Sequence, residues 1–143
     1  MKVAASLAGR RLALVDSSAY LAILDQDDEH HKVAQDILAA LTDAGFLLLT
    51  TNFVVAESHA LILSALGHRE ASEFLREIGV SRNRVLRVQE VDEQRARDII
   101  FRYEDKDFSM VDCTSFALIE RLSISCAFAF DRHFAQYGIQ TLE

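Results

Sequence analysis

Residues 11–18 read Arg-Leu-Ala-Leu-Val-Asp-Ser-Ser, a short apolar run that ends abruptly on a carboxylate and two hydroxyls. Four consecutive apolar positions without alternation are typical of a strand that is covered on both faces, as in a parallel sheet flanked by helices. In such sheets, ligands bind at the carboxyl ends of the strands. We therefore expect Asp16 to lie on the functional edge of the sheet. The simpler alternative is that Asp16 only caps the helix that follows it.

Length and charge limit the classes of protein to consider. The chain has 143 residues, of which 50% are hydrophobic, and this suits one compact domain over residues 1–143 with a substantial core. Its net charge of -7 argues against binding nucleic acid through a broad basic face. A metal-dependent nuclease is still compatible with this charge, since bound cations invert the local charge that a phosphate meets. We expect residues 1–10 to be a loosely held leader.

The two cysteines indicate a reducing compartment. Cys113 and Cys126 each lie in an apolar segment and form no C-x-x-C pair, so both are expected to be buried free thiols. No apolar run approaches the roughly 18 residues that a membrane span needs, and the first residues are too weakly apolar for a secretory signal. We expect a cytoplasmic protein.

Short apolar segments alternate with segments of helical periodicity along the chain. Strands are expected at Leu12–Val15, Phe46–Thr50, Val85–Val88, Cys126–Phe130 and Ile139–Leu142. Helices are expected at Ser18–Leu24, His30–Leu41, Phe53–Leu66 and Arg69–Ile78, then from Asp92, from Ser109 and through Phe134. This alternation predicts an α/β fold, a three-layer α/β/α sandwich around a mostly parallel sheet of four or five strands.

Four carboxylates are expected at the carboxyl edge of this sheet. Asp16 and Asp131 directly follow apolar strands, and Glu57 lies in the second turn of the helix that leaves the second strand. Glu57 has apolar helical neighbours, so its carboxylate should have a partner. Asp112 lies three residues after Ser109, which is the spacing of a capping box and would by itself explain this acid. The first turn of its helix nevertheless belongs to the same edge.

Carboxylates this close together would repel one another and raise one another's pKa values unless a cation neutralises them. An all-oxygen site favours Mg²⁺ or Mn²⁺ over Zn²⁺, because no His or Cys is placed to complete a tetrahedral site. A metal site of this kind suits phosphoryl chemistry, in which the metal activates a water and stabilises the leaving oxygen.

Four segments carry a resemblance to a known family. They are Val15-Asp-Ser-Ser18, Thr51-Asn-Phe-Val-Val-Ala-Glu57, Asp107-Phe-Ser-Met-Val-Asp-Cys113 and Ala129-Phe-Asp-Arg-His-Phe134. In this order they are similar to the motifs of the PIN domain family, and they most closely resemble the VapC-type toxins of bacterial toxin-antitoxin pairs. The similarity runs from Leu12 to the C-terminus, and four ordered motifs are far more specific than any one of them.

The resemblance implies an endoribonuclease that depends on Mg²⁺ or Mn²⁺ and acts as the toxin of a type II toxin-antitoxin system. It implies that the catalytic and metal-binding acids are Asp16, Glu57, Asp112 and Asp131, with none of the family's four missing. It also implies a homodimer and a cognate VapB-like antitoxin whose C-terminal arm blocks the site. The supporting polar residues are Asn52 and Ser109, and Asp107 is expected to line the approach to the metal.

Single-stranded loops are the expected targets, in a tRNA or an rRNA, because their bases and backbone can be splayed into a pocket. Candidates for contact with the RNA backbone are Arg10, Arg11, Arg82, Arg84 and Arg87. His133 is expected to pack or to contact phosphate. The pair His30-His31 is expected to be a solvated helix start.

Two other classes of function remain open. A receiver-like signalling module also gathers acids at this edge and binds Mg²⁺, but it calls for adjacent acids after the first strand and a Lys after the last core strand. Here Val15 precedes Asp16, and Arg132 follows Asp131. The third class is an interaction protein whose acids only bind a basic partner arm, and metal-dependent cleavage would separate it from an enzyme.

Overall fold

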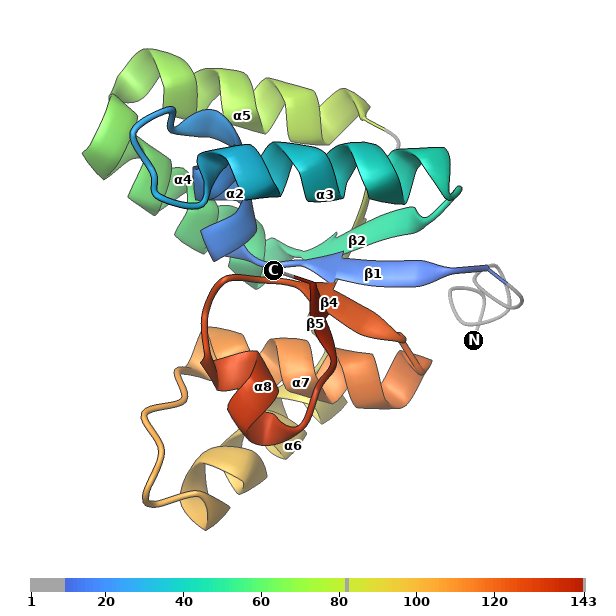
Figure 1. The fold of residues 1–143 in the computed structure, drawn as a ribbon. Helices are drawn as coiled ribbons and strands as arrows, with labels where there is room; N and C mark the ends of the chain where they lie inside the picture. The colour runs from blue at the N-terminus through green and yellow to red at the C-terminus, as the bar shows by residue number, and fades with distance from the viewer. Residues whose placement is uncertain (1–9, 82, 143) are drawn as a thin grey trace.

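The computed structural model describes residues 10–81 and 83–142, which form a three-layer α/β/α sandwich (Figure 1). The central sheet has the strand order β3-β2-β1-β4-β5, and every pair of neighbouring strands is parallel. The strands are β1 (Leu12–Val15), β2 (Leu47–Thr51), β3 (Arg84–Leu86), β4 (Cys126–Phe128) and β5 (Thr141–Leu142). The α/β fold predicted from the sequence is confirmed.

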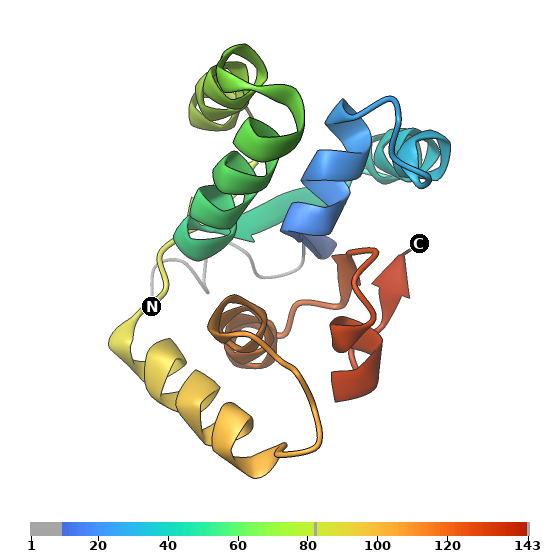
Figure 2. The ribbon, with the colours of Figure 1, turned by 90° about the vertical axis from the view of Figure 1, so that its left-hand side faces the viewer.

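Helices cover both faces of the sheet (Figures 1 and 2). One face is covered by α2 (Ser17–Leu24), α3 (His31–Asp43), α4 (Asn52–Leu66) and α5 (His68–Val80). The other face is covered by α6 (Glu90–Arg102), α7 (Met110–Leu122) and α8 (His133–Tyr137). Each layer therefore has its own hydrophobic core against the sheet.

Strand β1 is buried on both faces, and this explains why its four residues are all apolar. Leu12 and Leu14 pack into the core with α6, α7 and α8, while Ala13 and Val15 pack into the core on the opposite face. All four side chains are buried, as the alternation of side chains along a strand between two helical layers requires. The cysteines follow the same logic, since Cys113 and Cys126 are buried free thiols in the two different cores.

The order of the strands places a crevice at β1. From β1 the chain adds β2 and then β3 on one side, and it later returns to add β4 and β5 on the other side. Strand order therefore reverses between β1 and β4. In open α/β sheets, ligands bind outside the carboxyl ends of the strands at such a reversal. The residues that follow β1 and β4 lie at this crevice.

Three strands each have one boundary that lies two residues inside the predicted one: β3 ends at Leu86 rather than at Val88, β5 begins at Thr141 rather than at Ile139, and β4 ends at Phe128 rather than at Phe130. The change at β4 affects the site. The N–H of Phe130 donates to Oγ of Ser18 at 3.0 Å instead of to a neighbouring strand. Asp131 therefore lies in the loop between β4 and α8 and does not directly follow the strand as predicted. Of the predicted leader at residues 1–10, all but Arg10 lie outside the described residues.

An ion pair fixes α6 against α7. Asp92 is 1% exposed, and its two carboxylate oxygens accept from Nε and Nη2 of Arg121 at 2.8 and 3.0 Å. Asp92 also accepts from the N–H of Gln89 and so caps the start of α6. This pair ties the far end of α7 to α6, and Asp112 lies in the first turn of α7.

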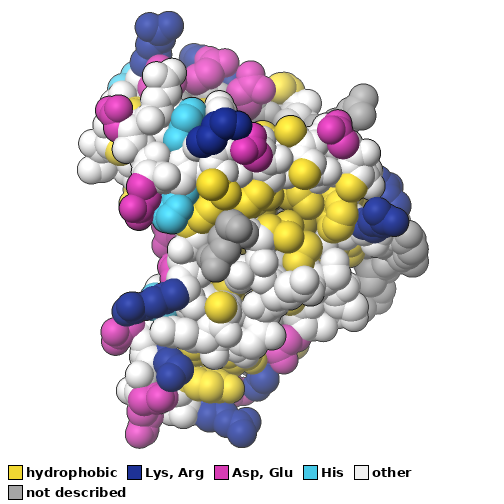
Figure 3. All heavy atoms as spheres, viewed as in Figure 1, with side chains coloured by type: hydrophobic (Ala, Val, Ile, Leu, Met, Phe, Trp, Pro, Cys, Tyr) yellow, Lys and Arg dark blue, Asp and Glu magenta, His cyan; other side chains and the backbone are white. Residues whose placement is uncertain are grey.

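The surface combines charged helices with an apolar band. On the face shown in Figure 3, hydrophobic side chains gather across the middle, below α3, and charged side chains gather on the helices above and below this band. None of the helices among the described residues is long and apolar enough to span a membrane.

Candidate functional site

Asp16 caps α2 with only one of its two carboxylate oxygens. Its Oδ2 accepts from the N–H of Ser18 at 3.2 Å and from Oγ of Ser18 at 2.7 Å. Its Oδ1 is buried and has no hydrogen-bond partner among the described residues. The capping role that the sequence suggested is therefore present, and it leaves one buried oxygen whose charge nothing in the described chain compensates.

The electrostatic environment of Asp16 links it to two other acids. Burial raises the pKa of Asp16 to about 6, and the nearby charges of Asp112 and Glu57 act in the same direction. The hydrogen bonds from Ser18 oppose this rise. Burial and like charges both disfavour the carboxylate form, and a bound cation would reverse that preference.

Glu57 is held by the residue that follows Asp16. Oγ of Ser17 donates to Oε1 of Glu57 at 2.5 Å. Helix α4 begins directly after β2, where Oγ1 of Thr51 accepts from the N–H of Val54 and caps the helix. The hydrogen bond thus joins two helices that leave neighbouring strands. It supplies the partner expected for a carboxylate on this apolar face.

Asp112 has the capping geometry predicted from its spacing and a second contact as well. The N–H of Ser109 donates to Oδ2 of Asp112 at 3.1 Å, and the N–H of Asp112 donates to Oγ of Ser109 at 3.0 Å. The same Oδ2 lies 2.8 Å from Nδ1 of His133. The capping box therefore holds the carboxylate in place and does not remove it from the site.

His133 lies between two of the acids. Its Nδ1 is 2.8 Å from Oδ2 of Asp112 and 3.2 Å from Oδ1 of Asp131, and its N–H donates to Oδ1 of Asp131 at 2.8 Å. The expectation that no His or Cys is placed to complete a metal site is wrong for His133, whose ring nitrogen lies with oxygens of Asp112 and Asp131 within 4.8 Å of one another. An Asp that accepts from the N–H two residues later forms a common turn. The two-residue spacing of Asp131 and His133 was the sequence signal that these two side chains lie close together.

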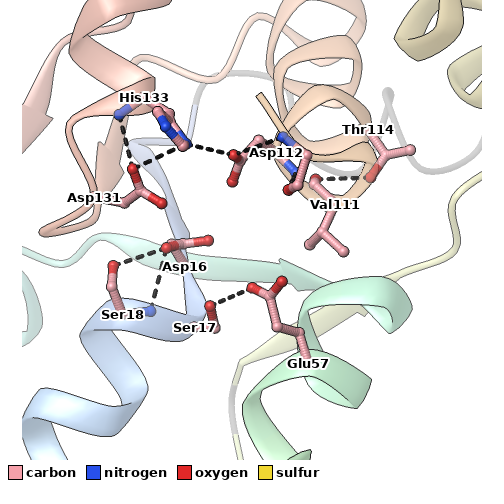
Figure 4. Close-up of polar contacts among 10 residues, drawn as sticks. Asp16, Ser17, Ser18, Glu57, Val111, Asp112, Thr114, Asp131 and His133 are labelled. Atoms are coloured by element: carbon pink, nitrogen blue, oxygen red, sulfur yellow. Dashed lines mark hydrogen bonds and ion pairs between the residues drawn. The ribbon is translucent and has the colours of Figure 1, made fainter. Parts of the chain in front are cut away.

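The four acids surround one space at the crevice. Figure 4 shows Asp112, Asp131 and His133 on one side, facing Asp16 and Glu57 on the other. A cavity of about 470 Å³ is lined by several residues, among them Asp16, Glu57 and Asp131. Ligand atoms of Asp112, Asp131 and His133 lie within 4.8 Å of one another. That compact group does not include Asp16 or Glu57, so the structure holds the acids as two facing groups.

The predicted supporting residues lie in different places. Ser109 caps α7 beside Asp112. The side chain of Asn52 accepts from the N–H of Val88 at 2.8 Å, and it lines a neighbouring cavity with His59 and Arg87 rather than the cavity of the acids. Asp107 is exposed in the loop before α7.

The predicted RNA-contacting arginines are spread over both ends of the sheet. Arg10 and Arg11 precede β1, and Arg84 begins β3, so all three lie toward the amino ends of strands and away from the acids. Arg87 follows the end of β3 and is exposed on the same edge as the acids. Arg82 lies outside the described residues.

The donor set fits a divalent cation. Carboxylate oxygens dominate it, and the unpartnered Oδ1 of Asp16 is a buried atom that a cation would satisfy. Oxygen ligands suit Mg²⁺ and Mn²⁺. The acidic groups together with His133 are therefore a candidate divalent-metal centre.

The chain is similar to a characterised endonuclease over most of its length. The chain is 29% identical over 130 residues to the 23S rRNA-specific endonuclease VapC20 of Mycobacterium tuberculosis, and the match covers 89% of this chain and 95% of that protein. The crystal structure of VapC20, described as a sarcin-ricin loop cleaving toxin, superposes with a TM-score of 0.83 at 28% identity, covering 89% and 95% of the two chains.

A more distant structure shares the fold. FitAcB from Neisseria gonorrhoeae superposes with a TM-score of 0.67 at 15% identity, over 92% of this chain and 96% of that chain. The family described as PIN domain matches residues 13–140, a range that includes all four acids and His133. This range runs from β1 almost to β5 and so contains nearly the whole sheet. The chain belongs to the PIN domain family.

Proposed function

We propose that this protein is a metal-dependent endoribonuclease that hydrolyses phosphodiester bonds in RNA. The catalytic and metal-binding acids of the proposal are Asp16, Glu57, Asp112 and Asp131. The observation that carries it is that Asp16, Glu57 and Asp131 line one cavity at the reversal of strand order, where Oδ1 of Asp16 is buried without a partner among the described residues. Asp112 joins this group through Asp131 and His133, since ligand atoms of the three lie within 4.8 Å of one another. Membership of the PIN domain family favours this function over a receiver-like module.

Each polar residue at the site has a defined task in this proposal. Bound Mg²⁺ or Mn²⁺ supplies Lewis acidity for activating a water and stabilising the leaving oxygen. Asp112 and Asp131 would hold the ion, and Asp16 would hold it through its unpartnered Oδ1. The imidazole of His133 orients the carboxylates of Asp112 and Asp131. Glu57, held by Ser17, presents a carboxylate from the other side of the cavity.

We further propose that the protein is a toxin that acts on structured RNA. VapC20 is an rRNA endonuclease by its description, and it is similar to this chain over 95% of its length. An rRNA loop is therefore the first substrate to test, and a tRNA loop is the second. A loop suits the site because its nucleotides are unpaired and can enter a cavity of about 470 Å³.

An antitoxin partner is part of this proposal. A third cavity, of about 280 Å³, is lined mainly by apolar side chains of α2, α3 and α5, including Tyr20 and Phe74. Three acids of α5 line it as well, and they are Glu70, Glu73 and Glu77. An apolar cleft with acidic residues at its edge complements an amphipathic segment that carries basic residues. We propose that a VapB-like antitoxin docks such a segment here and extends its C-terminal arm over the acids.

The working unit in this proposal is a homodimer. Apolar side chains remain exposed on α4 and α5, among them Leu63 and Leu75, each 43% exposed. Burial of such residues is a usual contribution to association. Sedimentation of the purified protein should give a mass twice that of the 16.1 kDa chain, and a monomer at all concentrations would contradict this part of the proposal.

The test of the enzyme is a cleavage experiment. Purified protein, free of antitoxin, is incubated with bacterial ribosomes, total RNA and Mn²⁺, and new 5′ ends are mapped by sequencing. We expect discrete cuts that need the metal and disappear in the Asp112→Asn variant, whose side chain can still cap α7. The control is Asp98→Asn, because Asp98 is exposed on α6 and no part of the proposed site includes it. Metal binding without any cut would favour an interaction protein instead.

A further inference from the structure

The cavity of the acids also contains a stack of two aromatic rings. The rings of His30 and Phe130 are nearly parallel, with 4.4 Å between their centroids and an angle of 6°. Both residues line the same cavity as Asp16, Glu57 and Asp131. Resting on the proposed ribonuclease function, we infer that the His30–Phe130 stack is a platform for a base of the RNA, next to the phosphate that is cut.

Phe130 is fixed relative to the acids by hydrogen bonds. Its N–H donates to Oγ of Ser18 at 3.0 Å, and the same hydroxyl donates to Oδ2 of Asp16 at 2.7 Å. Its ring packs against the fully buried ring of Phe128, with 6.0 Å between centroids and an angle of 70°. Asp131 is the next residue. The platform therefore has a defined position with respect to the acids on both sides of the cavity.

His30 is held by the turn that precedes α3. Its N–H donates to Oδ1 of Asp28 at 2.8 Å, and the turn before it is closed by the N–H of Asp27, which donates to Oδ1 of Asp25. The side chain of His30 remains 43% exposed although Phe130 covers part of it. The predicted solvated helix start is thus only partly right, because the imidazole is packed on one ring and still offers surface to a ligand.

The charge around His30 argues for a base and against a phosphate. The turn carries four acids, Asp25, Asp27, Asp28 and Glu29, and Oε1 of Glu29 lies 3.3 Å from Nε2 of His30. This negative charge disfavours a phosphate bound directly at His30. A flat aromatic surface, in contrast, attracts the face of any base, and unpaired bases of a loop are free to stack on it. The platform therefore recognises an unstacked base of single-stranded RNA.

The test compares RNA binding by three variants in the inactive Asp112→Asn protein. The probe is a short, fluorescently labelled single-stranded RNA of mixed sequence in Mg²⁺, and the measurement is the Kd from anisotropy. His30→Ala should weaken binding by about 5- to 150-fold, the usual range for loss of one stacked base. His30→Phe should restore binding because it keeps a ring. The control His68→Ala removes a histidine exposed on α5 and should leave the Kd unchanged.

Two further readouts separate this inference from the proposed function. With active protein and ribosomes, His30→Ala should raise KM far more than it lowers kcat, and the Mn²⁺ affinity should stay at the wild-type value. If wild-type protein cleaves RNA while His30→Ala keeps the wild-type Kd and KM, the platform is overturned and the ribonuclease stands. If the wild-type protein neither binds nor cleaves any RNA, both the platform and the ribonuclease function are overturned.

Discussion

Nδ1 of His133 lies 2.8 Å from Oδ2 of Asp112, an oxygen that also accepts the N–H of Ser109. The same carboxylate oxygen therefore caps helix α7 and contacts His133 at the site of the acids. The imidazole also contacts Asp131, so one side chain sets the separation of two acids that come from different elements. Such supporting contacts orient metal ligands and tune their affinity.

The first prediction concerns His133 and metal affinity. His133→Ala should raise the Kd for Mn²⁺ by about 10- to 100-fold, because Asp112 and Asp131 lose the group that orients them. Calorimetric titration with Mn²⁺ measures this directly. Thermal unfolding gives a second measure, since a free metal concentration of 100 times the Kd stabilises the native state by about 2.7 kcal/mol. An unchanged Kd in His133→Ala would contradict the orienting role.

The second prediction concerns the contact between Ser17 and Glu57. Ser17→Ala removes the hydroxyl that donates to Oε1 of Glu57. We expect cleavage to fall by about 10- to 100-fold, the usual effect of losing a residue that supports a functional side chain. The matched control is Ser125→Ala, whose hydroxyl donates to the backbone oxygen of Leu12 at the other end of β1. Equal activity of the two variants would show that Glu57 needs no such support.

The third prediction is a pH dependence that follows from Asp16. Its pKa in the folded protein is about 6, against an ordinary value of 3.8, so the folded state keeps a proton that the unfolded state releases. The stability that this proton contributes is fully present below pH 3.8 and is lost as the pH rises through 6. A shift of this size corresponds to about 3 kcal/mol.

The measurement is denaturant unfolding in a chelator, from pH 4 to pH 7.5. Asp16→Asn keeps an oxygen that can accept from Ser18 and has no proton to release, so it should lack this pH dependence. It should therefore exceed the wild-type protein in stability at pH 7.5 while matching it near pH 4. Parallel stability curves for the two proteins would contradict the raised pKa. Added Mn²⁺ should make the wild-type protein more stable than Asp16→Asn at pH 7.5, because the cation favours the carboxylate form of Asp16.

The fourth prediction concerns the ion pair between Arg121 and Asp92. Arg121→Ala leaves the carboxylate of Asp92 buried without its cation, and we expect a loss of about 2 to 3 kcal/mol in the free energy of unfolding. This is below the value for a fully buried pair because the side chain of Arg121 is 28% exposed.

The control for this pair is Arg95→Ala. Arg95 pairs with Glu120 at the surface, where both side chains are more than 40% exposed, so its loss should cost below about 1 kcal/mol. Urea unfolding compares the two variants. Both should retain wild-type cleavage when folded, since neither residue lies at the cavity of the acids. Equal stability losses would show that burial adds nothing to the Asp92 pair.

Local patterns in the sequence determined the architecture and the elements that carry the acids. The apolar run Leu12–Val15 indicated a strand buried on both faces, and the structure packs its side chains alternately into two cores. The spacing of Ser109 and Asp112 predicted a capping box that the structure contains. These features depend on residues close in sequence, and the periodicity of strands and helices fixes which side each residue faces.

Tertiary structure alone decided which side chains meet. Ser17 reaches Glu57 across 40 positions, Phe130 reaches Ser18 across 112, and the amide of Asn52 is used by Val88 rather than at the acids. The early end of β4 and the place of His133 between two acids follow from such contacts. A hydrogen bond forms only when donor and acceptor lie within about 3 Å. For residues far apart in the sequence, that separation is set by how helices and loops pack on the sheet. A local sequence pattern does not determine this packing.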